Sequence, residues 1–362
     1  MKVKIISEVS HKTTDENEIS IAINKIGEYF IRSVEEYIAV INELIYKQNE
    51  GCNVLWFYRG EREDNWHFEP SVFRKNFSKW EKRFFEEAHT RMPQEFESLT
   101  NIDRLAKMQH YRWPTRLLDF STNPLYALYF ACEDIILKKQ NHLTHDKSGR
   151  VYVISRKFRS ENKEKDVILS YNSDRAMLLG CLAKLSENEQ GLVKEFTEAL
   201  YDYNSKNKTE EVISRKTLGL KKTGEKNENK KALIFELLTK DKVKNAQSAF
   251  DRFYGEARKE RATFDDFGTN PEDLLKSFIF LPQKHKMKNE RLRDQGGAFC
   301  IFGLGSVRDE NNIRKECKSI LIPFECKKTI IQQLDFLGIN QSTVYADLEH
   351  AGNYVKDYIA GL

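Results

Sequence analysis

The sequence lacks the features that mark several common classes of protein. No stretch approaches the roughly 18 consecutive apolar residues of a membrane span, and the start MKVKIISEVSHK has no long apolar segment that would direct export. The six cysteines show no CxxC spacing; they are Cys52, Cys132, Cys181, Cys300, Cys317 and Cys326. We therefore expect reduced thiols, a cytoplasmic location and no membrane partner.

Motifs for many enzymes are also missing. There is no P-loop, GxGxxG, HExxH or zinc-finger spacing and no internal repeat, so no metal is expected. Charge is nearly balanced, with 59 basic and 55 acidic residues, which neither requires nor excludes an anionic partner such as a nucleic acid. The 362 residues are 40% apolar and 12% aromatic, enough to bury a large core.

Strand and helix patterns alternate along the chain and predict an α+β fold built on a mixed sheet. The predicted strands, rich in β-branched and aromatic residues, are 54–58, 151–154, 278–281, 298–302 and 319–322. The predicted helix starts carry capping boxes or single caps, namely Ser33 with Glu36, Ser78 with Glu81, Asn101, Asn123 and Ser173. Further helices are expected at about 325–337 and up to Ile359, and a loop at 142–150.

Composition divides the chain into four parts. Residues 1–32 form an N-terminal arm, 33–185 and 277–362 form the core, and 186–276 form a helical insertion rich in Lys, Glu and Asn. Within the insertion, 206–231 has the weakest apolar pattern and is expected to be mobile.

The most informative stretch is 108–131, MQHYRWPTRLLDFSTNPLYALYFA. A helix is expected to end near His110, and a turn then leads into the buried run 115–120. Asn123 can cap the next helix and Pro124 can occupy its first turn. Because the first amides of a helix are unpaired, a polar turn at such a start is a common scaffold for a binding site.

Arg59 has the strongest positional case for ligand contact. It follows the predicted strand 54–58 together with the flexible Gly60. A guanidinium can hold a phosphate or carboxylate through two bonds in a way that Lys cannot. A buried pair with Asp119 or Glu61 is the alternative, and the sequence leaves both readings open.

Four residues of the central stretch are further candidates. His110, next to Gln109, could serve as an acid, a base or a phosphate donor, or could be structural. Arg116 and Asp119 lie on opposite faces of a regular strand, so at least one must be paired or solvated. Structural pairing is the favoured reading for Asp119.

Other polar residues lie close to these motifs. Ser121 and Thr122 favour a local turn over substrate contact, because short hydroxyl side chains before a helix usually bond nearby backbone. Glu61 and Glu290 are the nearest carboxylates, and Gln295 precedes two glycines and a predicted strand.

Several of these segments resemble the FRG-domain family, named after its (F/Y)RG motif. The matching runs are WFYRGE at 56–61, QHY at 109–111, PTRLLD at 114–119 and NPL at 123–125. Segments 173–176, 291–299 and 334–348 are similar as well, so the resemblance extends from about residue 33 onward. It implies shared motifs without a settled activity.

A more distant resemblance is to ADP-ribosyltransferases of the Arg-Ser-Glu type. In those enzymes a YRG-like strand end holds NAD, a Ser-Thr strand leads into a helix, and a late strand brings a catalytic glutamate. Tyr58-Arg59-Gly60 matches the first part, and Phe120-Ser121-Thr122, with Ala127 and Phe130 after it, is similar to the second. For the third part the chain offers Gln295, with Glu290 five residues earlier, in place of Glu-x-Glu.

These resemblances imply a core like that of the ADP-ribosyltransferases and NAD as the cofactor. The implied ligand-binding residues are Tyr58, Arg59, Gly60, Gln109, Arg116, Asp119, Ser121, Thr122 and Gln295. The candidate catalytic residues are His110, for its place beside the motif, and Glu61 and Glu290, as the carboxylates nearest the motifs. An oxocarbenium-like ribosyl centre needs a carboxylate nearby, which is why the glutamates matter.

We therefore expect an ADP-ribosyltransferase-like or NAD-glycohydrolase-like protein of the kind found in bacterial toxins and phage-defence effectors. One alternative is a non-catalytic nucleotide- or nucleic-acid-sensing module, in which Arg59, Arg116 and the Lys-rich insertion hold phosphates. A nuclease is the other alternative. Consumption of NAD separates the first reading from the others.

Overall fold

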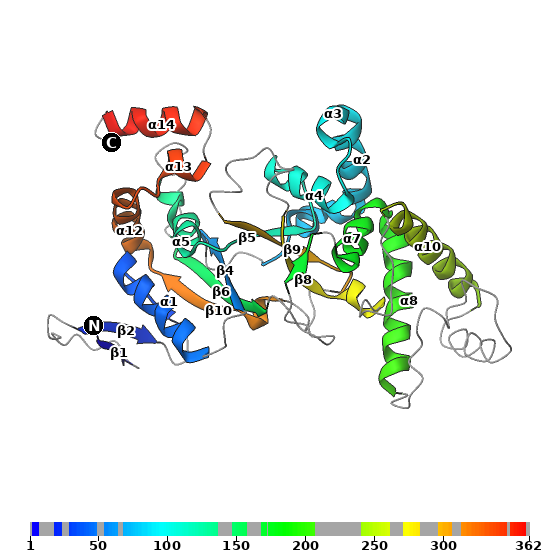
Figure 1. Ribbon diagram of the computed structural model, residues 1–362, viewed down its shortest axis with the longest axis horizontal. Helices are drawn as coiled ribbons and strands as arrows, with labels where there is room; N and C mark the ends of the chain where they lie inside the picture. The colour runs from blue at the N-terminus through cyan, green and yellow to red at the C-terminus, as the bar shows by residue number, and fades with distance from the viewer. Residues whose placement is uncertain are drawn as a thin grey trace.

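The computed structural model describes residues 2–6, 18–23, 29–48, 54–63, 68–136, 147–157, 168–171, 173–206, 240–260, 271–282, 296–305, 313–345 and 348–359. These residues form a mixed α+β fold around one sheet, with helices gathered in two groups (Figure 1). The strand order is β1-β2-β3-β10-β6-β4-β5-β9-β8-β7, in which β1 and β2 extend a mixed sheet of the other strands. The predicted α+β class is confirmed.

The strands are β1 (Lys2–Ile6), β2 (Glu18–Ile23), β3 (Tyr29–Phe30), β4 (Val54–Glu61), β5 (Leu117–Ser121), β6 (Gly149–Lys157), β7 (Leu169–Ser170), β8 (Ser277–Leu281), β9 (Gly297–Phe302) and β10 (Lys318–Ile322). The α-helices are α1 (Val34–Gln48), α2 (Glu81–Arg91), α3 (Pro93–Phe96), α4 (Asn101–His110), α5 (Pro124–Cys132), α7 (Asp174–Cys181), α8 (Glu187–Lys206), α10 (Lys240–Lys259), α12 (Phe324–Phe336), α13 (Gln341–Tyr345) and α14 (Leu348–Ile359). The 3-10 segments are η1 (Ser71–Trp80), η2 (Leu182–Lys184), η3 (Pro271–Leu275) and η4 (Ile313–Glu316).

Both groups of helices cover the same face of the sheet. Tyr58 lies opposite Ser121 of β5, and side chains alternate along a strand, so Leu117 points to the same side as Tyr58. Tyr58 belongs to the core under α1, α5 and α12, whereas Leu117 belongs to the core under α2, α4, α7, α8 and α10. The middle of β5 therefore lies between two separate hydrophobic cores.

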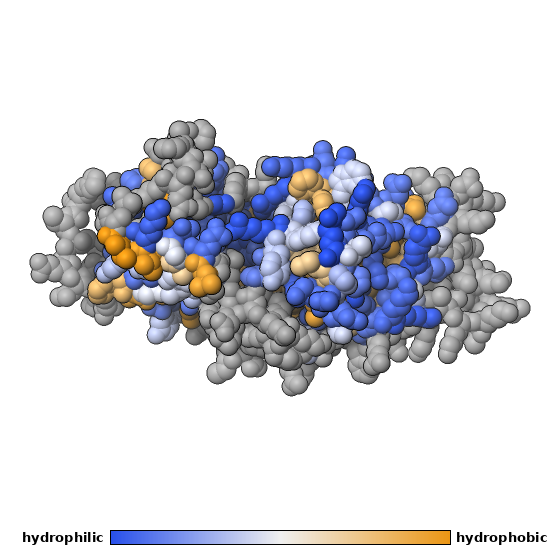
Figure 2. All heavy atoms as spheres, turned by 90° about the horizontal axis from the view of Figure 1, so that it is seen from above, coloured by the Kyte–Doolittle hydropathy of each residue, from blue (hydrophilic) through white to orange (hydrophobic). Residues whose placement is uncertain are grey.

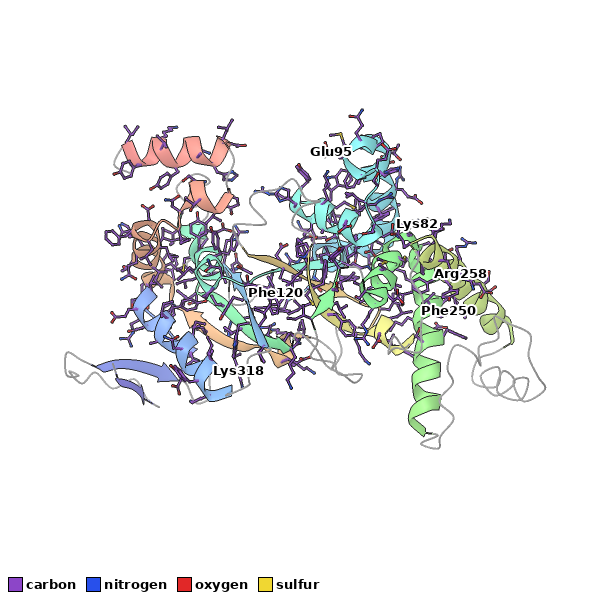
Figure 3. The ribbon with its side chains drawn as sticks, in the orientation of Figure 1. Lys82, Glu95, Phe120, Phe250, Arg258 and Lys318 are labelled. Carbon is purple, nitrogen blue, oxygen red and sulfur yellow. The ribbon has the colours of Figure 1, made fainter. Side chains whose placement is uncertain are left out.

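The opposite face of the sheet carries a third, smaller core. Phe57, Phe120 and Tyr152 pack there against Phe68, which follows β4 in the chain. Phe120 lies in the centre of the molecule (Figure 3). Side chains therefore alternate along β5 between the face covered by the two groups of helices and the face that carries the third core.

Helix α5 lies directly on the backbone of β4 and β6. A Cβ atom on Gly60 would lie 1.9 Å from the carbonyl oxygen of Ala127, and one on Gly149 would lie 2.2 Å from that of Ala131. Two glycines on neighbouring strands and two alanines one helical turn apart therefore let helix and sheet approach this closely.

Most of the predicted elements are confirmed, and three helix starts have the predicted caps. The side chains of Ser33, Asn123 and Ser173 accept hydrogen bonds from backbone amides of the first turn of α1, α5 and α7. One strand is longer than predicted, because Arg59 and Gly60 remain paired with β6 and so lie inside β4 instead of beyond its end. The loop predicted at 142–150 overlaps the start of a strand, since β6 begins at Gly149.

Two predicted caps are wrong. Helix α2 begins at Glu81 without a side-chain cap, because the Glu81 carboxylate binds Arg116 instead of reaching back to the helix start. Thr100, and not Asn101, caps α4, since its hydroxyl accepts a bond from the amide of Asp103. Asn101 instead donates to the sulfur of Cys181 on α7.

The described part of the 186–276 segment consists mainly of two helices that pack on the core. Rings of Phe196 on α8 and Phe250 on α10 lie 5.1 Å apart, and Phe253 is fully buried. Figure 3 shows Phe250 and Arg258 on α10, at the end of the molecule away from α14. Most of 206–231, expected to be mobile, lies outside the described residues.

Candidate functional site

Arg59 fills a gap where strands β4 and β5 diverge. Among the described residues, Tyr58 opposite Ser121 is the single register pair that joins these strands. Beyond it, Nη1 of Arg59 donates to the carbonyl oxygen of Asp119 at 2.8 Å, and Nε donates to Oε1 of Glu61 at 3.1 Å. The guanidinium thus donates to the carbonyl oxygen of Asp119, which has no paired residue on β4.

A chain of hydrogen bonds connects this arginine to α4. Gln109 donates from Nε2 to Oδ2 of Asp119 at 3.1 Å, and the hydroxyl of Thr115 donates to Oε1 of Gln109 at 2.5 Å. The sequence predicts that residues 58–60 and 110–121 come together at one pocket. Arg59 does contact the second segment, at the backbone carbonyl of Asp119, and the shared pocket stays a prediction. The exposed Asp119 lies where β5 passes between the two helical groups.

Arg74 is a second guanidinium beside the first, and sequence reasoning missed it. Its Nε and Nη2 donate to the carbonyl oxygen of Glu69 at 3.0 and 2.7 Å. Burial lowers the pKa of Arg74, and the positive charge of Arg59 lowers it further. Lys75 and Asn76 follow with φ of 52° and 59°, a left-handed pair that non-glycine residues rarely adopt. This strained turn fixes the position of Arg74, and no sequence pattern announces it.

Aromatic rings and buried polar atoms surround Arg59. Its guanidinium lies 5.8 Å from the ring centre of Phe68, and that ring lies 4.8 Å from the ring of Tyr152. Oε2 of Glu61 and the hydroxyl of Tyr152 are buried with no hydrogen-bond partner among the described residues. Burial raises the pKa of Tyr152, and the negative charge of Glu61 raises it further.

The hydrogen bonds of Arg59 leave part of its guanidinium free. In the described part of the chain, Nη2 has no partner, and the side chain is 11% exposed. Glu61 and the carbonyl of Asp119 orient the group without using all its donors. A bound anion could therefore accept from Arg59 without breaking either bond.

Arg116 differs from Arg59 because its donors are already used. Its Nε and Nη2 donate to the two carboxylate oxygens of Glu81 at 2.8 and 2.5 Å, Nη2 also donates to Gln190, and Nη1 donates to the carbonyl oxygen of Phe302. The side chain is 0% exposed. This geometry assigns Arg116 to the core and not to ligand contact.

Two other residues that were predicted to bind ligand point into the helix-covered face. Tyr58 is buried in the core under α5, on the face opposite Arg59, and burial raises its pKa to about 12. The backbone of Gly60 is covered by α5, so the helix occupies the space that was predicted to admit a ligand. Both residues position Arg59 and do not face the same side as its guanidinium.

The hydroxyls before α5 bond local backbone, which was the favoured reading. Oγ of Ser121 accepts from the amide of Asn123 at 2.9 Å and donates to its carbonyl oxygen at 3.0 Å. The hydroxyl of Thr122 donates to the carbonyl oxygen of Gly296, which has φ of 59°. The last candidates of this group, Glu290 and Gln295, lie outside the described residues.

His110 ends α4 and is half-buried, with its ring centre 4.9 Å from that of Tyr111. Gln109 precedes it and belongs to the hydrogen-bonded chain at Arg59. Within the described ranges, no group of His, Cys, Asp and Glu could hold a metal ion. No described helix is long and apolar enough to cross a membrane.

Residues 55–140 match the family model of the FRG domain. The matched segment holds Arg59, Glu61, Arg74, Gln109 and Asp119, whereas Tyr152, whose ring packs on Phe68 near the guanidinium, lies outside it. The match supports the FRG family for this part of the chain. No curated protein and no solved structure matches the chain.

Proposed function

We propose, with the FRG domain at 55–140 as the premise, that Arg59 holds the phosphates of a nucleotide such as NAD. The observation that supports this proposal is the incomplete use of the Arg59 donors. Its guanidinium is oriented by Glu61 and by the Asp119 carbonyl, and Nη2 remains available. Preorganised donors of this kind bind an anion without a further entropic cost of ordering.

The second guanidinium strengthens the proposal. Arg74 lies close enough to Arg59 for its pKa to be lowered by that charge, while the charges of Glu61, Glu69 and Asp119 raise it and offset part of the repulsion. Two like charges near each other repel, and an anion that contacts both relieves the repulsion. A diphosphate carries its charge over two neighbouring groups, which suits a pair of arginines.

The reaction that we propose is transfer of the ADP-ribose group or hydrolysis of the nicotinamide bond of NAD. Glu61 is the described carboxylate bonded to Arg59, but its Oε2 is buried and its side chain is 0% exposed, so it could stabilise a ribosyl centre only through its charge and not by contact. His110 and Glu290 remain proposed catalytic residues. Such an activity suits a bacterial toxin or a phage-defence effector that acts in the cytoplasm.

One observation favours the non-catalytic alternative. The carboxylate of Glu61 already binds Arg59 through Oε1, which lowers its capacity to stabilise a second positive centre. In that case the same residues would bind the nucleotide without changing it.

The test combines ligand binding, NAD consumption and thermal stability. Purified protein is titrated with NAD by calorimetry, and nicotinamide release is followed by chromatography. Arg59→Lys keeps the charge but loses the planar fork, so binding should weaken by at least about tenfold while the melting temperature changes little. Arg59→Ala should remove binding altogether and also lower the melting temperature, because it leaves the Glu61 carboxylate, which is 0% exposed, without its partner.

Two matched variants provide the controls. Arg91→Lys changes an arginine that is 69% exposed on α2 and should affect neither binding nor stability. Arg116→Lys should lower the melting temperature first, because it breaks a buried pair. Normal stability with weakened binding supports the phosphate clamp. The proposal would be wrong if the parent protein bound no nucleotide and the Arg59 variants only unfolded at a lower temperature. Arg59 would then serve only to stabilise the fold.

A further inference from the structure

The C-terminal helix α14 is turned with its apolar face outward. Its exposed hydrophobic side chains are Leu348 at 94%, Val355 at 48%, Tyr358 at 74% and Ile359 at 79%. Figure 2 shows a hydrophobic patch at the end of the molecule that carries α14 in Figure 1. Surface helices usually bury such a face, so this one is available to a partner.

The inner face of α14 is instead polar and aromatic. The ring of His350 stacks on Tyr345 of α13 at 4.1 Å, and the hydroxyl of Tyr354 donates to Oδ1 of Asp335 on α12 at 2.8 Å. These contacts fix the rotation of the helix about its axis. The outward direction of the apolar face is therefore set by specific bonds.

The exposed stripe is self-complementary. Leu348, Gly352, Val355 and Ile359 are separated by four, three and four residues, a spacing that reads the same from either end. In an antiparallel pair of such helices, Leu348 faces Ile359 of the partner subunit and Gly352 faces Val355 of the partner subunit. Among the described residues outside the α14 backbone, no atom lies within 4 Å of where a Cβ on Gly352 would be, so this position offers open space for a facing side chain.

Charges beside the stripe agree with the same arrangement. Glu349 and Lys356 are seven residues apart, which is two helical turns, so they lie on the same flank. In an antiparallel pair the same flanks of both helices meet, and Glu349 then lies beside Lys356 of the partner subunit. The two-fold axis repeats the contact, which gives two reciprocal ion pairs.

We propose that α14 is a dimerisation helix that pairs antiparallel with α14 of a second copy of this chain. A lipid surface fits less well, because the helix carries Glu349 and Asp357 against Lys356 and so has no excess of basic residues. A contact of one helix with one helix is small, so the dimer is expected to be weak, with a Kd on the order of 10 µM.

Sedimentation velocity of the full chain over a range of concentrations tests the proposal. The parent protein should shift from monomer to dimer as its concentration rises. Val355→Glu places a charge in the centre of the stripe and should leave only monomer. Its melting temperature at low protein concentration should not change, because the side chain is half exposed in the monomer.

A charge exchange tests the antiparallel direction. Glu349→Lys alone and Lys356→Glu alone each place like charges together and should weaken the dimer by at least about fivefold. The double variant restores both reciprocal pairs and should recover the parent Kd. Glu87→Lys, an equal charge change on α2, is the control and should have no effect.

Three outcomes would overturn the proposal. The first is a chain that remains monomeric at about 0.5 mM, well above the expected Kd. This holds also if the monomeric chain binds vesicles of phosphatidylcholine and phosphatidylserine. The second is a dimer that Val355→Glu does not change. The third is a charge exchange in which the double variant stays as weak as the single ones.

Discussion

Arg116 and Glu81 form a buried, two-point ion pair that connects β5 to the first turn of α2. Their nitrogen and oxygen atoms are 2.8 and 2.5 Å apart, and the side chains are 0% and 2% exposed. Gln190 of α8 bonds both partners, which brings a third element into the same cluster. The pair thus connects the FRG-matching segment to helix α8, which lies outside that segment.

Removing one partner of this pair should strongly destabilise the fold. Arg116→Ala or Glu81→Ala leaves an uncompensated buried charge, which costs about 3–5 kcal/mol of the free energy of unfolding. The double variant Arg116→Met with Glu81→Leu should lose clearly less than either single variant, because no charge remains. Urea denaturation measures all three, and equal losses in singles and double would contradict the account.

Gly60 should tolerate no side chain. In Gly60→Ala the added Cβ would meet the carbonyl oxygen of Ala127 at 1.9 Å, so α5 must move away from β4. The expected cost is about 3 kcal/mol, at the upper end for overpacking a core. Gly191→Ala is the matched control on α8, where no described atom outside the helix backbone lies within 4 Å of the added Cβ, and it should stabilise by about 0.5–1 kcal/mol. A Gly60→Ala protein of parent stability would show that the helix does not pack this tightly.

Lys327 should contribute to stability although it is a buried charge. Its Nζ donates to the carbonyl oxygen of Arg62 at 2.7 Å and to Oδ1 of Asp134 at 2.9 Å, and the side chain is 0% exposed. Lys327→Met keeps the volume but leaves both acceptors unpaired, so we expect a loss of about 1–3 kcal/mol. The exposed neighbour Lys328→Met should lose less than about 0.5 kcal/mol in the same denaturation experiment.

The protein should lose stability at alkaline pH. Burial raises the pKa of Cys181 from its ordinary value of 9.0 to about 12, and that of Tyr58 from 10.0 to about 12. Folding therefore favours the protonated forms. Their contribution is fully present below the unfolded values and is lost as the pH rises from about 9 towards 12, because the unfolded chain ionises first.

Thermal melting between pH 8 and pH 11 measures this loss. Cys181→Ala should flatten the decrease, because one of the raised groups is removed, even if its melting temperature at pH 7 is slightly lower. A slope that is unchanged in the variant would show that this thiol is not the group responsible. Native Cys181 should also react slowly with a thiol reagent at pH 8, since little thiolate forms there.

Interactions within a few residues could be predicted from the sequence alone. Ser33, Asn123 and Ser173 cap their helices as expected, because the acceptor oxygen and the amide lie only two or three residues apart. The contact of Arg59 with the segment 110–121 was also predictable, since both polar segments leave apolar elements of the same core, whereas the predicted shared pocket remains to be tested. Arg74 was not, because a left-handed turn places it there and no periodic pattern marks such a turn.

The sequence by itself determined the α+β class and the main strands and helices. Only the tertiary structure decided which polar side chains have all their donors and acceptors satisfied in the core and which do not. Ser78 and Glu81 have the spacing of a capping box, yet Glu81 binds Arg116, which is 35 residues away. A buried guanidinium must find a carboxylate, and that long-range requirement is stronger than a local cap. Arg59 and Arg116 look alike in the sequence, and among the described residues their different partners alone leave Arg59 with an unused donor while those of Arg116 are taken.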